Sequence, residues 1–209
     1  MAHLARWIAA HPDYKSLSSI AAEKEEPVTV ETVAEMYKAA AKQAPQDPEP
    51  RVVLGVLHNL SQEYDDAVDV LREATKIAPT DFTLWNKLGA TLANASQPQE
   101  ALYAYQKAID IRPNYIRGYV NFGMAYQSQD RQDEAIKMFV KALQVGANQR
   151  PAGRHGMQVW YYLQGAVGQV AKSSGKEKLN ELVKAAFDAS RGSESEFAAA
   201  LHTLLQMLD

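Results

Sequence analysis

The chain repeats itself every 34 residues, and this period limits the possible folds more than any other feature of the sequence. One proline, one glycine and two alanines recur at the interval, as Pro45, Pro79 and Pro113; Gly55, Gly89 and Gly123; Ala67, Ala101 and Ala135; and Ala74, Ala108 and Ala142. Agreement of this many positions at one interval is not accidental. Periods of this size are typical of folds that stack one small structural unit on the next.

The pattern within each period predicts two antiparallel helices. The middle period shows it best, as Trp85-x-x-Leu88-Gly89-x-x-Leu92 followed by Ala101-x-x-x-Tyr105, Ala108 and Pro113. Small residues allow the two helices to approach closely, and proline ends the second helix because it cannot continue one. Helix pairs of this length and pattern resemble the tetratricopeptide repeat (TPR). We assign three full repeats to residues 48–81, 82–115 and 116–149.

The segments on either side of these repeats are less regular. Residues 1–47 read as a remnant of preceding repeats, with second helices at 3–11 and around Val33 and Tyr37, joined by a polar linker over 13–29. After the third repeat, a glycine-rich stretch predicts a loop over 150–157, followed by three helices within 158–209. Ser193-x-x-Glu196 is a capping box before the last of them. The expected fold is an all-α TPR superhelix with a C-terminal three-helix cap.

Composition and missing motifs exclude several classes of function. The 22 basic and 25 acidic residues give a formal charge of -3, which argues against nucleic-acid binding by bulk electrostatics. The chain has no cysteine, and no apolar run is long enough for a membrane span. Sequence motifs of phosphate-binding, hydrolytic and zinc-dependent enzymes are missing, and no two histidines have metal-ligand spacing. We therefore expect no catalytic residues, no metal and no cofactor, with His58 in a core position.

A helical projection separates a polar stripe from the packed face on the first helix of the second and third repeats. At ~100° per residue, the stripes consist of Asn86, Lys87, Ala90, Asn94, Arg117, Asn121, Met124 and Ser128. An Asn amide offers a donor and an acceptor to a peptide group, and the Arg fork suits a carboxylate. If the repeats stack in register, the two stripes are neighbours. The pattern predicts a surface that binds the C-terminal end of a peptide.

Three stretches of the sequence resemble one receptor family. The run LWNKLGATLAN at 84–94 closely resembles the peroxin-5 family of peroxisomal import receptors, and LGVLHNLS at 54–61 and PNYIR at 113–117 resemble its adjoining repeats. The loop around Pro151, with Trp160, resembles its C-terminal extension, so that the likeness extends over nearly the whole chain. The resemblance implies a cytoplasmic receptor that cycles to the peroxisomal membrane. Its cargo would end in S-K-L or a variant, the type 1 peroxisomal targeting signal.

The resemblance also assigns roles to residues. It implies that Asn86, Asn94 and Asn121 bond the peptide backbone, that Arg117 helps to neutralise the terminal carboxylate, and that Lys87 and Ala90 border the terminal side-chain pocket. Import machinery would bind through regions outside this chain. Two departures matter: the family's earlier repeats, which form the other wall of the cavity, are missing here, and Ser128 replaces a frequent Asn. We therefore expect this chain alone to bind signal peptides weakly or not detectably.

Two other interpretations remain open. A co-chaperone-type TPR module would hold the acidic tail of a chaperone, but this needs several cations, and the stripe offers mainly Lys87 and Arg117. A structural scaffold would instead join proteins through the groove or through the C-terminal helices. Binding of an amidated peptide separates these interpretations from carboxylate recognition, because a scaffold does not require a free carboxylate.

Overall fold

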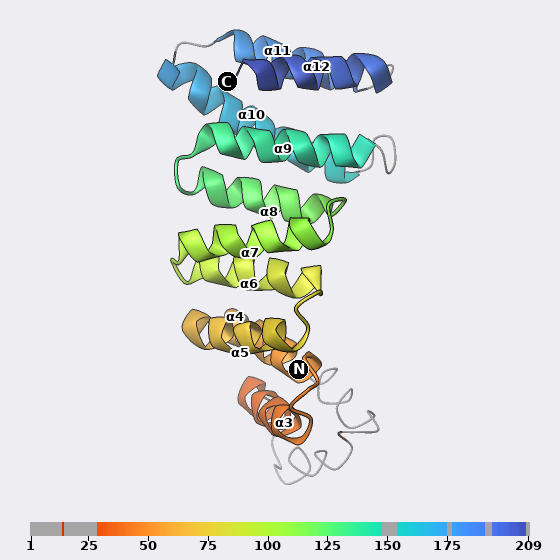
Figure 1. The fold of residues 1–209 in the computed structure, drawn as a ribbon. Helices are drawn as coiled ribbons and strands as arrows, with labels where there is room; N and C mark the ends of the chain where they lie inside the picture. Colours follow the sequence, from red (N-terminus) through yellow and green to blue (C-terminus); the bar gives the residue numbers. More distant parts are fainter. Residues whose placement is uncertain (1–13, 15–28, 148–153, 175–176, 191–193, 208–209) are drawn as a thin grey trace. The chain divides into compact units, whose positions relative to one another are not determined.

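The described part of the chain is entirely helical. The structure, a computed structural model, describes residues 14, 29–147, 154–174, 177–190 and 194–207 (Figure 1). Its helices are α3 (Val30–Gln43), α4 (Glu49–Leu60), α5 (Tyr64–Ile77), α6 (Phe82–Asn94), α7 (Pro98–Ile111), α8 (Ile116–Gln127), α9 (Gln132–Ala147), α10 (Arg154–Ser174), α11 (Lys178–Ala189) and α12 (Glu194–Gln206). The expected all-α TPR fold is confirmed. The helix expected at 3–11, nearly all of the linker at 13–29 and Ser193 lie outside the described residues.

The helices follow the 34-residue period. The pairs α4 and α5, α6 and α7, and α8 and α9 fall within residues 48–81, 82–115 and 116–149. The first helix of each pair ends in the same turn, where Gln62, Ser96 and Asp130 have left-handed φ angles of 63°, 57° and 57°. The amide of the residue after each of them donates to the carbonyl five positions earlier, for example Glu63 N to His58 O at 2.9 Å. This turn ends the helix and satisfies a carbonyl that would otherwise lack a partner.

Close approach of the paired helices depends on glycine. A Cβ atom added to Gly55 in α4 would lie 2.6 Å from Leu71 Cγ in α5, and one added to Gly123 in α8 would lie 2.5 Å from Phe139 Cε1 in α9. Leu71 and Phe139 are both buried. At Gly55 and Gly123 the recurring glycine therefore marks the point where one large buried side chain of the second helix rests on the backbone of the first.

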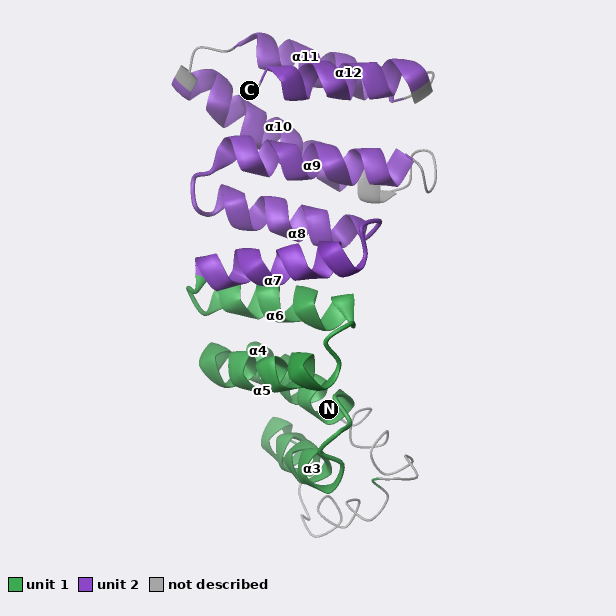
Figure 2. Ribbon diagram, viewed as in Figure 1, with its two compact units in different colours: residues 1–97 green, residues 98–209 purple. Residues whose placement is uncertain are grey.

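The chain divides into two compact units, residues 1–97 and 98–209 (Figure 2). The boundary falls inside the 82–115 repeat, between α6 and α7. In the first unit, α3 packs on α4, α4 on α5 and α5 on α6. Val33, Met36 and Tyr37 of α3 join Leu54 and Leu57 of α4 in one buried cluster. The helix that the sequence pattern predicts around Val33 and Tyr37 is present as α3, and both residues lie on its buried face.

The C-terminal helices belong to the second unit. Both α10 and α12 pack against α9, and α11 pairs with α12. Trp160 of α10 meets Phe187 edge-on, with ring centroids 5.4 Å apart, and Phe197 at 6.1 Å. The loop expected over 150–157 is corrected, because residues 154–157 already belong to α10. A single glycine within a helix costs only about 1 kcal/mol, and burial of Val159, Trp160 and Leu163 just beyond favours the longer helix.

Candidate functional site

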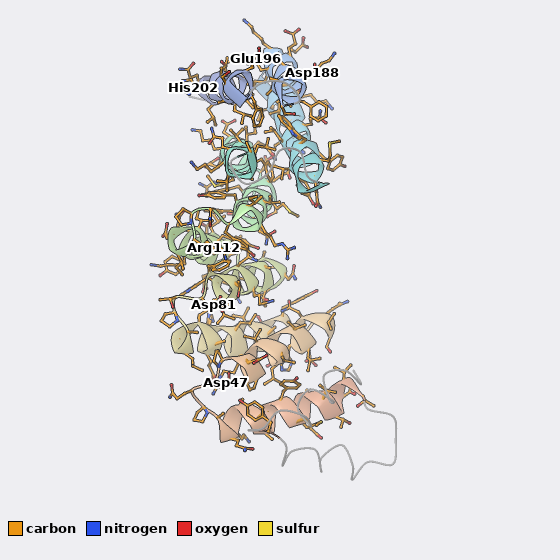
Figure 3. All side chains as sticks on the ribbon, turned by 90° about the vertical axis from the view of Figure 1, so that its right-hand side faces the viewer. Asp47, Asp81, Arg112, Asp188, Glu196 and His202 are labelled. Carbon is orange, nitrogen blue, oxygen red and sulfur yellow. The ribbon has the colours of Figure 1, made fainter. Side chains whose placement is uncertain are left out.

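The start of α6 is fixed by two local interactions. Asp81, labelled in Figure 3, caps the helix, and its Oδ1 accepts from the Thr83 amide at 2.8 Å and from the Thr83 hydroxyl at 2.7 Å. One turn later, the Trp85 indole Nε1 donates to the Pro79 carbonyl at 2.8 Å. These bonds hold the first turn of α6, while its buried residues Leu84, Leu88 and Leu92 keep the opposite stripe toward the surface.

The four stripe residues of α6 differ in how far they reach the surface. Lys87 and Asn94 are exposed, Ala90 is half-buried, and Asn86 is only 7% exposed. The ammonium group of Lys87 has no ion-pair partner among the described residues. Lys87 and Asn94 are thus the groups on α6 that present a cation and an amide most openly.

A buried polar network, which sequence reasoning missed, holds α4 beside α6. The Asn59 amide donates to the Gly55 carbonyl and to Thr91 Oγ1, both at 2.8 Å. The Thr91 hydroxyl in turn donates to the Lys87 carbonyl at 3.1 Å, and Thr91 is 2% exposed. No local sequence pattern marks this network, because the bond joins residues 32 positions apart on two helices that the fold brings together. The network supports the α6 backbone directly beneath Lys87.

The bond from an aromatic side chain to a proline carbonyl, seen at the start of α6, recurs at the start of α8. The Tyr119 hydroxyl donates to the Pro113 carbonyl at 3.1 Å, 34 residues after the Trp85 bond. Burial, helped by the negative charge of Asp110, raises the pKa of the Tyr119 hydroxyl, which therefore stays protonated as a donor. In the preceding turn, Arg112 (labelled in Figure 3) donates from Nε to Asn114 Oδ1 at 3.2 Å. The first turn of α8 thus shares the aromatic bond of α6 but lacks its side-chain cap, because the side chain of the N-cap residue Tyr115 forms no capping bond.

The stripe residues of α8 also differ in exposure. Arg117 is exposed and forms no ion pair within the part of the chain that is described, whereas Asn121 is half-buried. Met124 is 42% exposed. Ser128 lies just past the end of α8, where its hydroxyl donates to the Ala125 carbonyl at 2.9 Å. Arg117 is therefore the open cation of α8, and the Ser128 hydroxyl hydrogen is already engaged.

The predicted site residues fall into two groups. Asn86, Lys87, Ala90 and Asn94 belong to the first compact unit, and the α8 residues belong to the second. Each group lies along one helix. That the two groups contact one ligand remains a prediction.

The same repeat positions on α4 carry apolar side chains. Val56 and Leu60 occupy the positions that Ala90 and Asn94 hold one period later, and they are 42% and 67% exposed. Sequence reasoning overlooked them because it looked for polar groups, although the 34-residue period identifies them directly. Since the Asn59–Thr91 bond joins α4 to α6, this apolar surface belongs to the same unit as Lys87 and Asn94.

One group of potential metal ligands lies at the turn between α4 and α5. The ligand atoms of His58, Glu63 and Asp66 lie within 4.8 Å of one another, and His58 Nδ1 is 2.6 Å from Glu63 Oε2. Sequence reasoning compared histidines only with one another and so missed this group. Asp66 lies in the first turn of α5, where the partial positive charge of the helix end favours carboxylates without any metal. The His58–Glu63 hydrogen bond likewise accounts for the position of both side chains.

No helix in the described ranges combines the length and apolar character that crossing a bilayer requires.

Two models of the tetratricopeptide repeat match the chain, over residues 30–92 and 80–148. The peroxisomal targeting signal 1 receptor of Dictyostelium discoideum is 40% identical over 111 residues, which cover 49% of this chain and 17% of the relative. The peroxisomal targeting signal receptor of Candida albicans is 34% identical over 135 residues (59% and 22%), and the human PEX5-related protein is 37% identical over 112 residues (46% and 18%). This chain thus spans about a fifth of the length of these curated relatives.

Solved structures of MamA are also similar. One is 25% identical with a TM-score of 0.57, covering 70% of this chain and 86% of its own. A second, 18% identical with a TM-score of 0.63, covers 95% of this chain and 96% of its own, and shows the fold alone. The sequence matches to the curated relatives extend over about half of the chain, less than the nearly complete likeness expected from its motifs.

Proposed function

Because residues 30–148 of this chain belong to the tetratricopeptide-repeat family, we propose that it is the peptide-binding part of a receptor for peroxisomal targeting signals. The relatives that support this proposal are named as such receptors in Dictyostelium discoideum and in several yeasts. The ligand would be the C-terminal tripeptide of a cargo protein, Ser-Lys-Leu or a variant. The receptor would take up cargo in the cytoplasm and deliver it to the peroxisomal membrane, through machinery bound outside this chain.

The observation that carries the proposal is the exposed, unpaired guanidinium of Arg117. A solvent-exposed arginine with no carboxylate partner in the described residues is available to a carboxylate from outside, and its forked donors fit that group in two parallel bonds. Asn94 and Asn121, with Asn86, would bond the backbone amides of the ligand. Lys87 and Ala90 would border the terminal side chain.

The proposal includes a weak affinity for this chain alone. Ser128 supplies a shorter side chain than Asn, and its hydroxyl already donates to the Ala125 carbonyl. A contact to the ligand at this position would have to use the remaining lone pairs of the hydroxyl oxygen. Each missing bond to a charged group weakens binding by about 1.5–3 kcal/mol.

Fluorescence anisotropy with a labelled peptide ending in Ser-Lys-Leu tests the proposal. We expect the free acid to bind at least tenfold more tightly than the amidated peptide, and Arg117→Ala to remove that difference. Arg112→Ala is the matched control, because it removes the same charge five residues away and should change affinity by less than twofold. Equal binding of acid and amide by the unmodified chain would contradict carboxylate recognition.

A scaffold function is the second candidate, and one observation favours it. Met157 and Tyr161 on α10 are 60% and 72% exposed, which is unusual for large apolar side chains. A partner protein could bind there without a free carboxylate. If the acid and amide bind equally, Tyr161→Ala in a pull-down against a defined partner becomes the decisive variant.

A further inference from the structure

A second cavity, separate from the polar stripe residues, lies in the first unit among α3, α4 and α5. Its volume is about 340 Å³. Three cations, Lys38, Lys42 and Arg51, and one carboxylate, Glu73, line it together with apolar side chains that include Leu54 and Val70. None of these residues belongs to the candidate peptide site. The cavity carries an excess of positive charge although the whole chain has a formal charge of -3.

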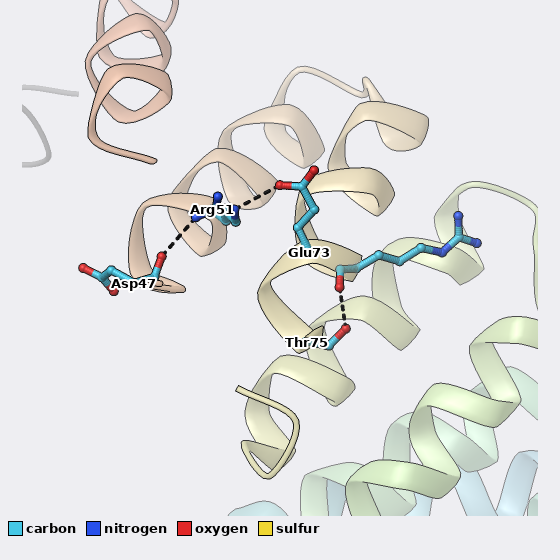
Figure 4. A network of polar contacts seen from close by, with 5 residues as sticks. Asp47, Arg51, Glu73 and Thr75 are labelled. Atoms are coloured by element: carbon cyan, nitrogen blue, oxygen red, sulfur yellow. Dashed lines mark hydrogen bonds and ion pairs between the residues drawn. The ribbon is translucent and has the colours of Figure 1, made fainter. Parts of the chain in front are cut away.

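The arginine of this cavity is already satisfied. Arg51 Nε donates to Glu73 Oε2 at 3.0 Å, and its Nη1 donates to the Asp47 carbonyl at 3.2 Å (Figure 4). The Arg51 side chain is 13% exposed, against 61% for Glu73. Arg51 and Glu73 therefore form a neutral, fixed part of the wall, and they leave the excess charge on the two lysines.

The positive charges of Lys38 and Lys42 are not neutralised in this way. They lie one turn apart on α3, both are exposed, and neither forms an ion pair with any residue that the structure describes. Two like charges at this spacing repel each other and slightly destabilise a helix. An anion placed between them would remove that repulsion, so the arrangement is stabilised by a ligand rather than by the protein itself.

The remaining wall is apolar. Ala41 and Val70 are half-buried and Pro45 is exposed, whereas Leu54, at 3%, belongs to the buried cluster of this unit. A small inorganic anion would leave these surfaces in contact with water, whereas a peptide can place a carboxylate on a lysine and an adjacent apolar side chain against the aliphatic wall. The combination of charge and apolar surface thus favours an acidic, partly apolar ligand.

We propose that this cavity binds an acidic peptide segment, with its carboxylates on Lys38 and Lys42 and a neighbouring apolar side chain against Val70 and Pro45. The recognition is independent of the ligand's terminal carboxylate. It gives the chain a second peptide site, whose occupant is an internal acidic segment of a partner protein.

Fluorescence anisotropy with a labelled hexapeptide of alternating Glu and Leu, amidated at its C-terminus, tests the proposal. Amidation removes the terminal carboxylate that the proposed receptor function requires, so that failure here is distinct from failure of the receptor function. We expect the peptide with Gln in place of Glu to bind at least tenfold more weakly. The double variant Lys38→Gln/Lys42→Gln should weaken binding of the acidic peptide by a similar factor, whereas Lys141→Gln, an exposed lysine on α9, should change it by less than twofold.

A further variant separates specific binding from general attraction. Glu73→Gln removes the one carboxylate of the cavity, and it should tighten binding of the acidic peptide several-fold. Circular dichroism confirms that the variants remain folded. Equal binding of the Glu and Gln peptides, a double variant no weaker than Lys141→Gln, or weaker binding by Glu73→Gln would each overturn the proposal. Saturable calorimetric binding of inorganic phosphate without binding of the peptide would also overturn it and assign a small-anion site.

Discussion

Gly55 in α4 faces Leu71 of α5 as closely as Gly123 in α8 faces Phe139 of α9, although these two hairpins are two periods apart in the sequence. Both hairpins also turn through a left-handed residue, Gln62 in one and Asp130 in the other. The contacts between the paired helices therefore follow the 34-residue period even where the residue types change.

The exposed residues of the same two hairpins do not follow the 34-residue period. Leu60, which ends α4, is 67% exposed and apolar, whereas its counterpart Ser128 bonds to its own helix. A buried position accepts only a few residue types, because its side chain must fit its neighbours. An exposed position can vary, so its residue type is available for binding a partner.

Apart from truncation of a core side chain, substitution of the glycines at the close helix contacts should have the largest effect on stability. We expect Gly123→Ala to lower the free energy of unfolding by about 2 kcal/mol and Gly55→Ala by about 1 kcal/mol, because the buried Phe139 ring yields less than the Leu71 side chain. Urea denaturation followed by circular dichroism measures both. Gly168→Ala on α10 is the control, since a Cβ there meets nothing within 4 Å, and helix propensity predicts a gain of up to about 1 kcal/mol. A loss at Gly168 as large as that at Gly123 would refute the contact as the cause.

The aromatic contact at the start of α8 should have the next largest effect. Tyr119→Phe keeps the ring and removes the hydroxyl that donates to the Pro113 carbonyl, so we expect the free energy of unfolding to fall by about 1 kcal/mol. The same denaturation experiment on Tyr161→Phe, whose residue is 72% exposed, should show a change within about 0.5 kcal/mol. If the two variants lose equal stability, the carbonyl bond does not position α8.

The left-handed turns should yield a smaller, favourable effect. Replacing Gln62 or Asp130 by glycine removes the steric penalty of a side chain at positive φ, and we expect each change to raise the free energy of unfolding by about 0.5–1 kcal/mol. Ser61→Gly is the matched control, because Ser61 has a φ of -82° and gains nothing from glycine. Thermal melts resolve the difference. A gain at Ser61 equal to the gain at Gln62 would point to a different origin.

Exposed repeat positions should tolerate change with the smallest effect on stability. We expect Leu60→Ser to alter the free energy of unfolding by less than about 0.5 kcal/mol. Leu57→Ala, three residues earlier and 1% exposed, should lower it by about 2–5 kcal/mol. A loss of several kcal/mol from Leu60→Ser in the same urea titration would show that this residue is part of the core.

The fold could be predicted from the sequence because the residues that form the buried contacts recur every 34 positions. The recurrence of proline, glycine and alanine, with Gly55 and Gly123 among them, predicts the helix pairs, and Val33 and Tyr37 match the second helix of a repeat, where α3 lies. The start of α10 was not accessible, because residues 154–157 carry no strong helix signal, and the helix there depends on burial of Trp160 and its neighbours.

The candidate site was accessible only in part. The period places Lys87 and Asn94 on one side of α6, and the structure leaves both of them exposed. The period does not show which side chains other helices cover. Asn86, for example, lies on the same stripe but is only 7% exposed. The Asn59–Thr91 bond and the lysines of the second cavity depend on which helices become neighbours, and no local pattern encodes that.

The tryptophan contacts give each compact unit its own optical reporter. The indole of Trp85 is bonded to the Pro79 carbonyl in the first unit, and that of Trp160 is packed between two phenylalanines in the second. The chain has three tryptophans, so replacing Trp7 and one of the other two by phenylalanine leaves a single emitter in a chosen unit. Two such variants would show by fluorescence whether the units unfold together or one after the other.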